Sequence, residues 1–183
     1  MMNGDLPEDH ILGCASGPLA IWARHEHMVA ALGRILKSYG FICKFDVKEN
    51  LKEGSKRTAD LHVMDLFPYT HVDIDFTVVS NLSNSNRTIS KVPKKILERA
   101  EEIKHEKYAD TFEQNKDIFG DRKFMVFAMD TFGNFGNEAL EIIKQIAITD
   151  SIRENTTIFE ASEKIKNIMS AAMVNFVGKQ LSC

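Results

Sequence analysis

Residues 71–79 alternate between apolar and polar side chains, and this pattern constrains the fold more than any other in the chain. Successive side chains of a β-strand point to opposite faces of the sheet. A strand here would place its apolar members on one face and its polar members on the other: Val72, Ile74, Phe76 and Val78 against Asp73, Asp75 and Thr77. The first face needs a hydrophobic core. The second face would hold two carboxylates side by side, which calls for an explanation.

Residues 93–110 have the period of an amphipathic helix. Three apolar side chains mark the predicted stripe: Leu97, Ala100 and Ile103. Lys107 falls inside that stripe, and Lys104 lies beside it. Because an unpaired buried charge is costly, inward ammonium groups need an anionic partner. The carboxylates of strand 71–79 supply one, and carboxylates with lysine are the parts of a metal-dependent phosphodiesterase.

The remaining patterns predict the order α-β-β-β-α-β-α-α. Helices are expected over 20–38, 137–148 and 157–181, with Asn137 as a cap, and strands over 41–47, 58–66 and 124–129. The short link 67–70 predicts an antiparallel hairpin. We therefore expect an α/β domain over residues 20–183, with a mixed sheet and the site at its edge, after an irregular segment 1–19.

Composition limits the possible functions. A chain of 183 residues is long enough for one domain with a real core. Its net charge of -3 argues against binding nucleic acid through bulk positive charge, so any such contact must be local. Three cysteines without a Cys-x-x-Cys pair predict a reducing compartment. Neither a membrane span nor a signal peptide is expected from the hydropathy pattern.

Asp60 lies in the predicted strand that precedes Asp75, with only a short hairpin between the two strands. Two adjacent carboxylates repel each other, and a divalent cation relieves that repulsion. Oxygen ligands suit Mg²⁺ or Mn²⁺ better than Zn²⁺. Such an ion polarises a phosphodiester and activates water, while Lys104 or Lys107 would orient water or stabilise developing charge. Asp73 is a further candidate metal ligand.

Four segments together form a recognisable set: Arg24-His25-Glu26, Arg57-Thr58-Ala59-Asp60, Asp75-Phe76-Thr77-Val78-Val79-Ser80 and Lys104-His105-Glu106-Lys107-Tyr108. They resemble the PD-(D/E)xK, or restriction-endonuclease-like, nuclease superfamily, and most closely the endonuclease domain of non-LTR retrotransposons. In that group the matching motifs read Arg-His-(Asn/Asp), Arg-Pro-Asp, Asp-Val-Thr-Val-Val-Ser and Lys-x-x-Lys-Tyr. The segment His10-Ile11-Leu12-Gly13-Cys14 also resembles the tail of the zinc knuckle that precedes this nuclease.

The resemblance implies a restriction-endonuclease-like fold and Mg²⁺- or Mn²⁺-dependent nicking of target DNA for retroelement integration. It implies DNA and an adjoining reverse transcriptase domain as partners, a nuclear location within the cell, and leaves a homodimer open. Catalysis would fall to Asp60, Asp75, Lys104 and Lys107. Contact with DNA or support of the site would fall to Arg24, His25, Arg57 and Tyr108.

The chain departs from the family pattern at several positions. Thr77 stands where simpler members of the superfamily carry a lysine. The resemblance to the retrotransposon group implies that this lysine is replaced by one in the following helix. Without a Cys-x-x-Cys half, His10 and Cys14 cannot complete a four-ligand zinc site. Two other functions remain open: a junction-resolving or repair nuclease, and a catalytically inactive or domesticated module that binds DNA or a protein. Asp73 and Asp75 could also simply face solvent, and Lys104 and Lys107 could cover apolar surface with their stems while their ammonium groups reach water.

Overall fold

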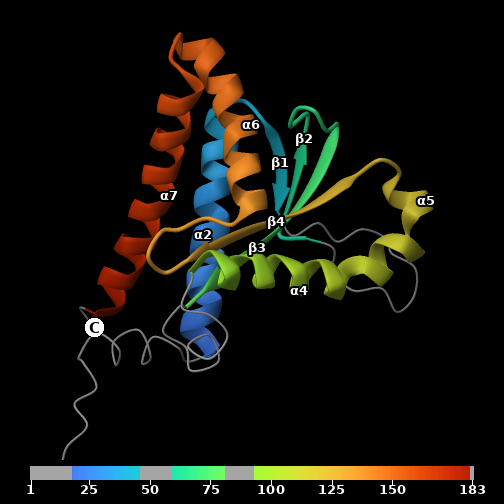
Figure 1. Ribbon diagram of the computed structural model, residues 1–183, viewed down its shortest axis with the longest axis horizontal. Helices are drawn as coiled ribbons and strands as arrows, with labels where there is room; N and C mark the ends of the chain where they lie inside the picture. Colours follow the sequence, from blue (N-terminus) through green and yellow to red (C-terminus); the bar gives the residue numbers. More distant parts are fainter. Residues whose placement is uncertain (1–17, 46–58, 81–92, 182–183) are drawn as a thin grey trace, which may run out of the picture.

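The computed structural model describes residues 18–45, 59–80 and 93–181, and Figure 1 shows how their elements are arranged. The elements are α2 (Pro18–Ser38), β1 (Ile42–Phe45), β2 (Leu61–Met64), β3 (His71–Val79), α4 (Pro93–Gln114), α5 (Lys116–Phe119), β4 (Lys123–Asp130), α6 (Asn137–Glu154) and α7 (Ile158–Leu181). The predicted roles of His10, Cys14 and Arg57 fall on residues outside these ranges.

The four strands form one mixed sheet in the order β1-β2-β3-β4. β1 pairs with β2 and β2 with β3 in the antiparallel sense, whereas β4 runs parallel to β3. The hairpin predicted between β2 and β3 is confirmed, as is the α/β class with a mixed sheet. The carboxylates lie on β3 and directly before β2, the inner strands, so the predicted position at the edge of the sheet is wrong.

Helices cover both faces of the sheet. In Figure 1, α2, α6 and α7 lie on one side, and α4 crosses the other. The larger core lies between the sheet and the helices α2, α6 and α7, and it contains Val72, Ile74 and Phe76. Beneath α4 a smaller core gathers Leu97, Tyr108, Phe124, Val126 and Ala128. The predicted separation of faces along 71–79 is therefore confirmed, and the aspartates occupy the side that α4 covers.

The N-terminus of α6 is capped by a side chain of another helix, and not by a neighbouring residue in the sequence. We predicted Asn137 as the cap, but Gly136 occupies that position and provides no side-chain hydrogen bond. The Glu138 N–H donates to Glu101 Oε1 of α4 at 3.0 Å. Asn137 is instead the first helical residue, and its amide donates to Glu98 at 3.3 Å. A tertiary contact thus satisfies a free backbone donor of the helix.

Replacing Gly136 by alanine is expected to lower the free energy of unfolding by about 1–3 kcal/mol. The new Cβ would overlap Glu101 Oε1 and lie 3.1 Å from the Cβ of buried Ala128. Glu101 would have to move and release the Glu138 N–H. Urea denaturation measures the change, with exposed Asn137→Ala as a neighbouring control expected within about 0.5 kcal/mol of wild type. Equal stability of the Gly136→Ala variant and wild type would contradict the close contact.

Candidate functional site

Asp60 and Asp75 face each other across the β2–β3 hairpin. Leu61 pairs with Ile74, and the Asp60 N–H donates to the Ile74 carbonyl at 3.0 Å, so the antiparallel register continues to Asp60. Both aspartates are buried, with exposed fractions of 8% and 3%. The charge of Asp60 also acts to raise the pKa of Asp75. The structure therefore brings together two carboxylates that lie apart in the sequence.

Two side chains of α4 contact the Asp75 carboxylate. The Lys104 Nζ lies 2.5 Å from Oδ2, and the Tyr108 hydroxyl donates to Oδ1 at 2.8 Å. Burial raises the pKa of Asp75, the Lys104 ammonium acts against that rise, and Asp60 adds to it. The Lys104 contact is an ion pair between an ammonium group and a buried carboxylate. A buried carboxyl with a perturbed pKa and a fixed charge partner is a candidate functional group.

The Asp60 carboxylate is held by backbone and by α2. Its Oδ2 accepts the Phe76 N–H at 2.7 Å. The His25 Nε2 lies 3.1 Å from that oxygen and 3.1 Å from the Phe76 carbonyl oxygen. Because both neighbours are acceptors, Nε2 carries a proton and donates to them. The hydrogen bond to Asp60 raises the pKa of His25 although burial opposes the rise. His25 therefore fixes one carboxylate and one backbone carbonyl at the same point.

The two lysines of α4 occupy different environments. The predicted apolar stripe placed Lys107 inward, and this prediction is wrong: Lys107 is exposed, with Nζ 3.4 Å from the Tyr108 hydroxyl. Ile103 is 49% exposed, whereas Glu101 and Tyr108 are buried. The helix turns its polar residues inward because Glu101 and Lys104 find partners there, the Glu138 N–H and Asp75. Lys104 is the lysine at the site.

Asp73 lies on the same sheet face but has partners of its own. Its Oδ1 accepts a hydrogen bond from His62 Nδ1 at 2.6 Å, and Arg122 Nη1 lies 3.9 Å from Oδ2. Sequence analysis gave Asp73 a possible role as a metal ligand and did not identify His62 as its partner. The structure offers no support for Asp73 as a ligand beside Asp60. The missed signal was strand pairing, which sets His62 opposite Asp73.

Arg24 and His25 come from the same turn of α2. Arg24 is buried, burial lowers the pKa of its guanidinium, and its Nε has no hydrogen-bond acceptor among the described residues. His25 reaches Asp60, as described above, so the pair contributes one contact to the site. Tyr108, predicted as a supporting residue, reaches the site through its hydroxyl.

The donor set suits a hard cation. Asp60, Asp75 and the Phe76 carbonyl offer oxygen atoms, and both carboxylates are buried. The described residues hold no set of three His, Cys, Asp or Glu side chains arranged for a metal ion. Mg²⁺ commonly keeps several waters and uses only one or two carboxylates. The residues present therefore fit Mg²⁺ or Mn²⁺ and do not fit a fully protein-ligated zinc centre.

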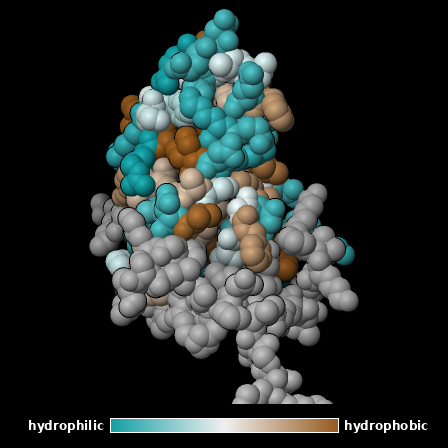
Figure 2. All heavy atoms as spheres, turned by 90° about the vertical axis from the view of Figure 1, so that its left-hand side faces the viewer, coloured by the Kyte–Doolittle hydropathy of each residue, from teal (hydrophilic) through white to brown (hydrophobic). Residues whose placement is uncertain are grey.

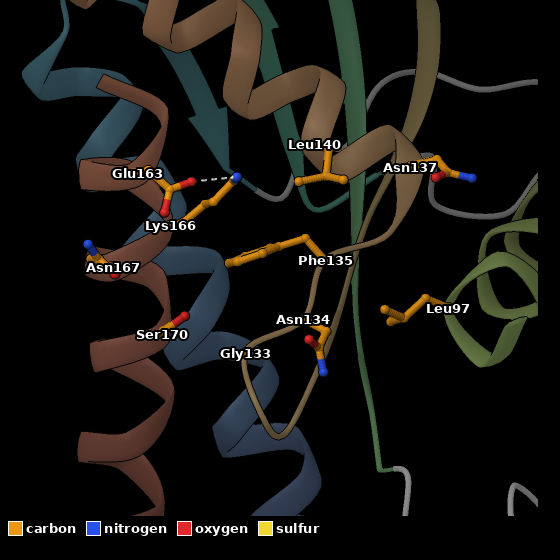
Figure 3. A pocket seen from close by; sticks show the side chains of 10 residues that line it. All are labelled: Leu97, Gly133, Asn134, Phe135, Asn137, Leu140, Glu163, Lys166, Asn167 and Ser170. Carbon is orange, nitrogen blue, oxygen red and sulfur yellow. Dashed lines mark hydrogen bonds and ion pairs between the residues drawn. The ribbon is translucent and has the colours of Figure 1, made fainter. Parts of the chain in front are cut away.

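Two hollows lie near α4. One, of about 540 Å³, is lined by residues of the turn before α6, α6, α7 and Leu97, and it includes the Glu163–Lys166 ion pair at 2.8 Å (Figure 3). None of its lining residues belongs to the carboxylate site. The other, of about 350 Å³, has aromatic walls formed by Tyr108, Phe112 and Phe124. Tyr108 connects that second hollow to Asp75.

The side of the molecule formed by α7 is shown in Figure 2, where apolar surface lies in patches between polar areas. Exposed apolar side chains of α7 include Ile158, Phe159, Ile168 and Val174. Asp75 lies on the other face of the sheet, under α4.

No protein-family model matches this chain, and a search of curated proteins finds no match either. Among the residues that the structure describes, no helix has the length and hydropathy needed to cross a membrane. A function is therefore inferred from the geometry above and from the resemblance of the motif segments.

Proposed function

We propose that this domain hydrolyses phosphodiester bonds of DNA with Mg²⁺ or Mn²⁺, as a restriction-endonuclease-like nuclease that nicks target DNA for a retroelement. The observation that carries the proposal is the ion pair between Lys104 and buried Asp75, with the buried carboxylate of Asp60 opposite Asp75 on the hairpin. The element order and the parallel pairing of β3 with β4 agree with it. An adjoining reverse transcriptase domain and a nuclear location belong to the same proposal.

Each residue has a distinct part in the proposed reaction. A cation held by Asp60 and Asp75 would polarise the phosphodiester and lower the pKa of the attacking water. The Lys104 ammonium, 2.5 Å from Asp75, keeps positive charge where negative charge develops in the transition state. Tyr108 orients the Asp75 carboxylate, and His25 orients Asp60 together with the Phe76 carbonyl. Holding these groups in advance lowers the cost of reorganisation during the reaction.

Plasmid nicking by two lysine variants tests this assignment. Lys104→Met is expected to reduce the Mg²⁺-dependent rate about 10²–10³-fold, because a charge beside Asp75 is lost. Lys107→Met removes the same charge from the same helix, but Lys107 is exposed and contacts Tyr108 instead, so its effect should be much smaller. Equal losses in both variants would contradict the role of Lys104. Absence of nicking by wild type with Mg²⁺ and with Mn²⁺ would reject the function.

An inactive binding module is a second candidate, and one observation favours it. Oxygens of both carboxylates already meet donors of the chain itself: Phe76 N–H and His25 at Asp60, and Tyr108 and Lys104 at Asp75. A site satisfied in this way holds together without a cation. DNA affinity that is unchanged by metal chelation, together with no nicking, would identify this second function.

A further inference from the structure

The smaller of the two hollows beside α4 has aromatic walls, and we call it the aromatic hollow. The Phe124 ring, at the start of β4, has the ring centroids of Tyr108 and Phe112 each 5.1 Å from its own. His105 contacts the same ring edge-on at 5.2 Å. These contacts between rings hold the walls in place. The hollow has a volume of about 350 Å³ and is lined by His105, Tyr108, Ala109, Phe112, Lys123 and Phe124.

Tyr108 belongs both to the aromatic hollow and to the proposed nuclease site. Its hydroxyl donates to Asp75 Oδ1 at 2.8 Å, while the residue also lines the hollow. A group bound in the hollow therefore contacts a side chain that also contacts the proposed catalytic carboxylate. In a DNA strand only one deoxyribose separates a phosphodiester from the base beside it. A phosphodiester at Asp75 would thus bring a neighbouring base close to the hollow.

The outer edge of β4 provides hydrogen-bonding groups for such a base. The even-numbered residues of this strand direct their backbone groups away from β3, since the Val126 N–H donates to Glu138 Oε2 at 2.6 Å. The Ala128 carbonyl likewise accepts the Gly136 N–H at 2.9 Å. Phe124 has the same place in this alternation, so its backbone directs one donor and one acceptor to the outer edge. Nucleobase edges carry donors and acceptors that match these groups.

The charges around the aromatic hollow favour a neutral base with phosphates outside it. None of the six lining residues is acidic, and Lys123 is exposed. The Lys107 Nζ lies 3.4 Å from the Tyr108 hydroxyl, so a second ammonium group is close. Elsewhere on α4, Glu106 and Asp110 are exposed and would repel a phosphate backbone. Phosphates would therefore be held near the lysines, and the uncharged part of a nucleotide suits the aromatic walls.

We propose that the aromatic hollow binds an unstacked base of the DNA strand whose phosphodiester lies at Asp75. This inference rests on the nuclease function proposed above. Aromatic side chains stack on the face of any base, so the hollow positions the strand without reading its sequence. Inside a duplex both faces of a base are covered by its neighbours, so the base must leave the stack before it can enter.

NMR titration of the full chain without divalent metal tests the binding in the absence of nicking. Deoxyadenosine monophosphate should shift the ring resonances of Tyr108, Phe112 and Phe124, whereas deoxyribose 5-phosphate, which lacks the base, should not. A short single-stranded oligonucleotide should cause the same shifts at a concentration at least about ten-fold lower. Absence of shifts with the oligonucleotide, or equal shifts with deoxyribose 5-phosphate, would overturn the proposal. Shifts with the mononucleotide alone would assign the hollow to a free nucleotide and also overturn it.

Two variants alter the hollow without changing a charge. Ala109→Leu fills it from α4, and Phe112→Leu keeps an apolar side chain but removes an aromatic face. Each should weaken oligonucleotide binding by about ten-fold. Ala171→Leu makes the same change as Ala109→Leu at an exposed position of α7 and should bind like wild type. Wild-type affinity in both Ala109→Leu and Phe112→Leu would contradict base binding in the hollow.

The nicking assay separates this inference from the function on which it rests. Ala109→Leu should raise the KM for DNA by about ten-fold, while Ala171→Leu should keep the wild-type KM. Nicking by wild type together with an unchanged KM in Ala109→Leu would overturn the base site and leave the nuclease function standing. Ring shifts with the oligonucleotide but no nicking by wild type would support the base site and reject the nuclease function.

Discussion

Asp75→Asn is expected to lose Mg²⁺-dependent DNA nicking by about 10²–10³-fold or more while the protein stays folded. Asparagine has nearly the same size and keeps an oxygen for the Tyr108 hydroxyl, but it lacks the charge that would hold a cation and pair with Lys104. Burial raises the pKa of Asp75, so the folded protein disfavours its charge, and a neutral residue should be tolerated. The initial rate of plasmid nicking at fixed Mg²⁺ is the measurement.

Asp110→Asn is the matched control, because it makes the same chemical change at an exposed position of α4. It should nick at the wild-type rate. Thermal melting of all three proteins shows whether a lost rate reflects lost fold. Nicking by a folded Asp75→Asn variant at the wild-type rate would contradict the proposed role of the carboxylate pair.

Local periodicity was sufficient to predict most elements. The predicted strand 71–79 coincides with β3 because strict alternation matched a strand that is buried on both faces. The helix predicted over 93–110 continues to Gln114 and is followed by α5, since nothing in the pattern after residue 110 marks a stop. The cap of α6 was wrong because its acceptor, Glu101, lies on another helix. Element type is a local property, whereas element ends depend on tertiary contacts.

The candidate site could be predicted only in part from the sequence. A short hairpin was enough to place Asp60 near Asp75, because antiparallel register follows directly from the turn. The side of α4 that faces the sheet could not be predicted, because the helix buries polar residues whose partners come from β3 and α6. Apolar spacing therefore pointed to Lys107, and the structure places Lys104 at Asp75. Polar pairs formed across elements can override a weak hydrophobic stripe.

Phe127→Ala is expected to lower the free energy of unfolding by about 3–5 kcal/mol. The Phe127 ring is fully buried in β4 and stacks on Phe76 of β3, with centroids 5.0 Å apart and planes 14° apart. Phe135 contacts it edge-on at 6.1 Å. Truncation removes both aromatic contacts and leaves a cavity at the parallel β3–β4 pairing, which the sheet cannot close without moving. Urea denaturation monitored by circular dichroism gives the midpoint and slope.

Phe132→Ala is the control for this truncation, because Phe132 is 61% exposed in the turn after β4 and should change stability by no more than about 0.5 kcal/mol. A loss below about 1 kcal/mol in Phe127→Ala would contradict the packing of the larger core. The same cavity should also affect the site, because the Phe76 N–H holds Asp60 and the Phe76 carbonyl contacts His25. Nicking by Phe127→Ala should therefore decline at temperatures below its melting transition, whereas Phe132→Ala should follow wild type.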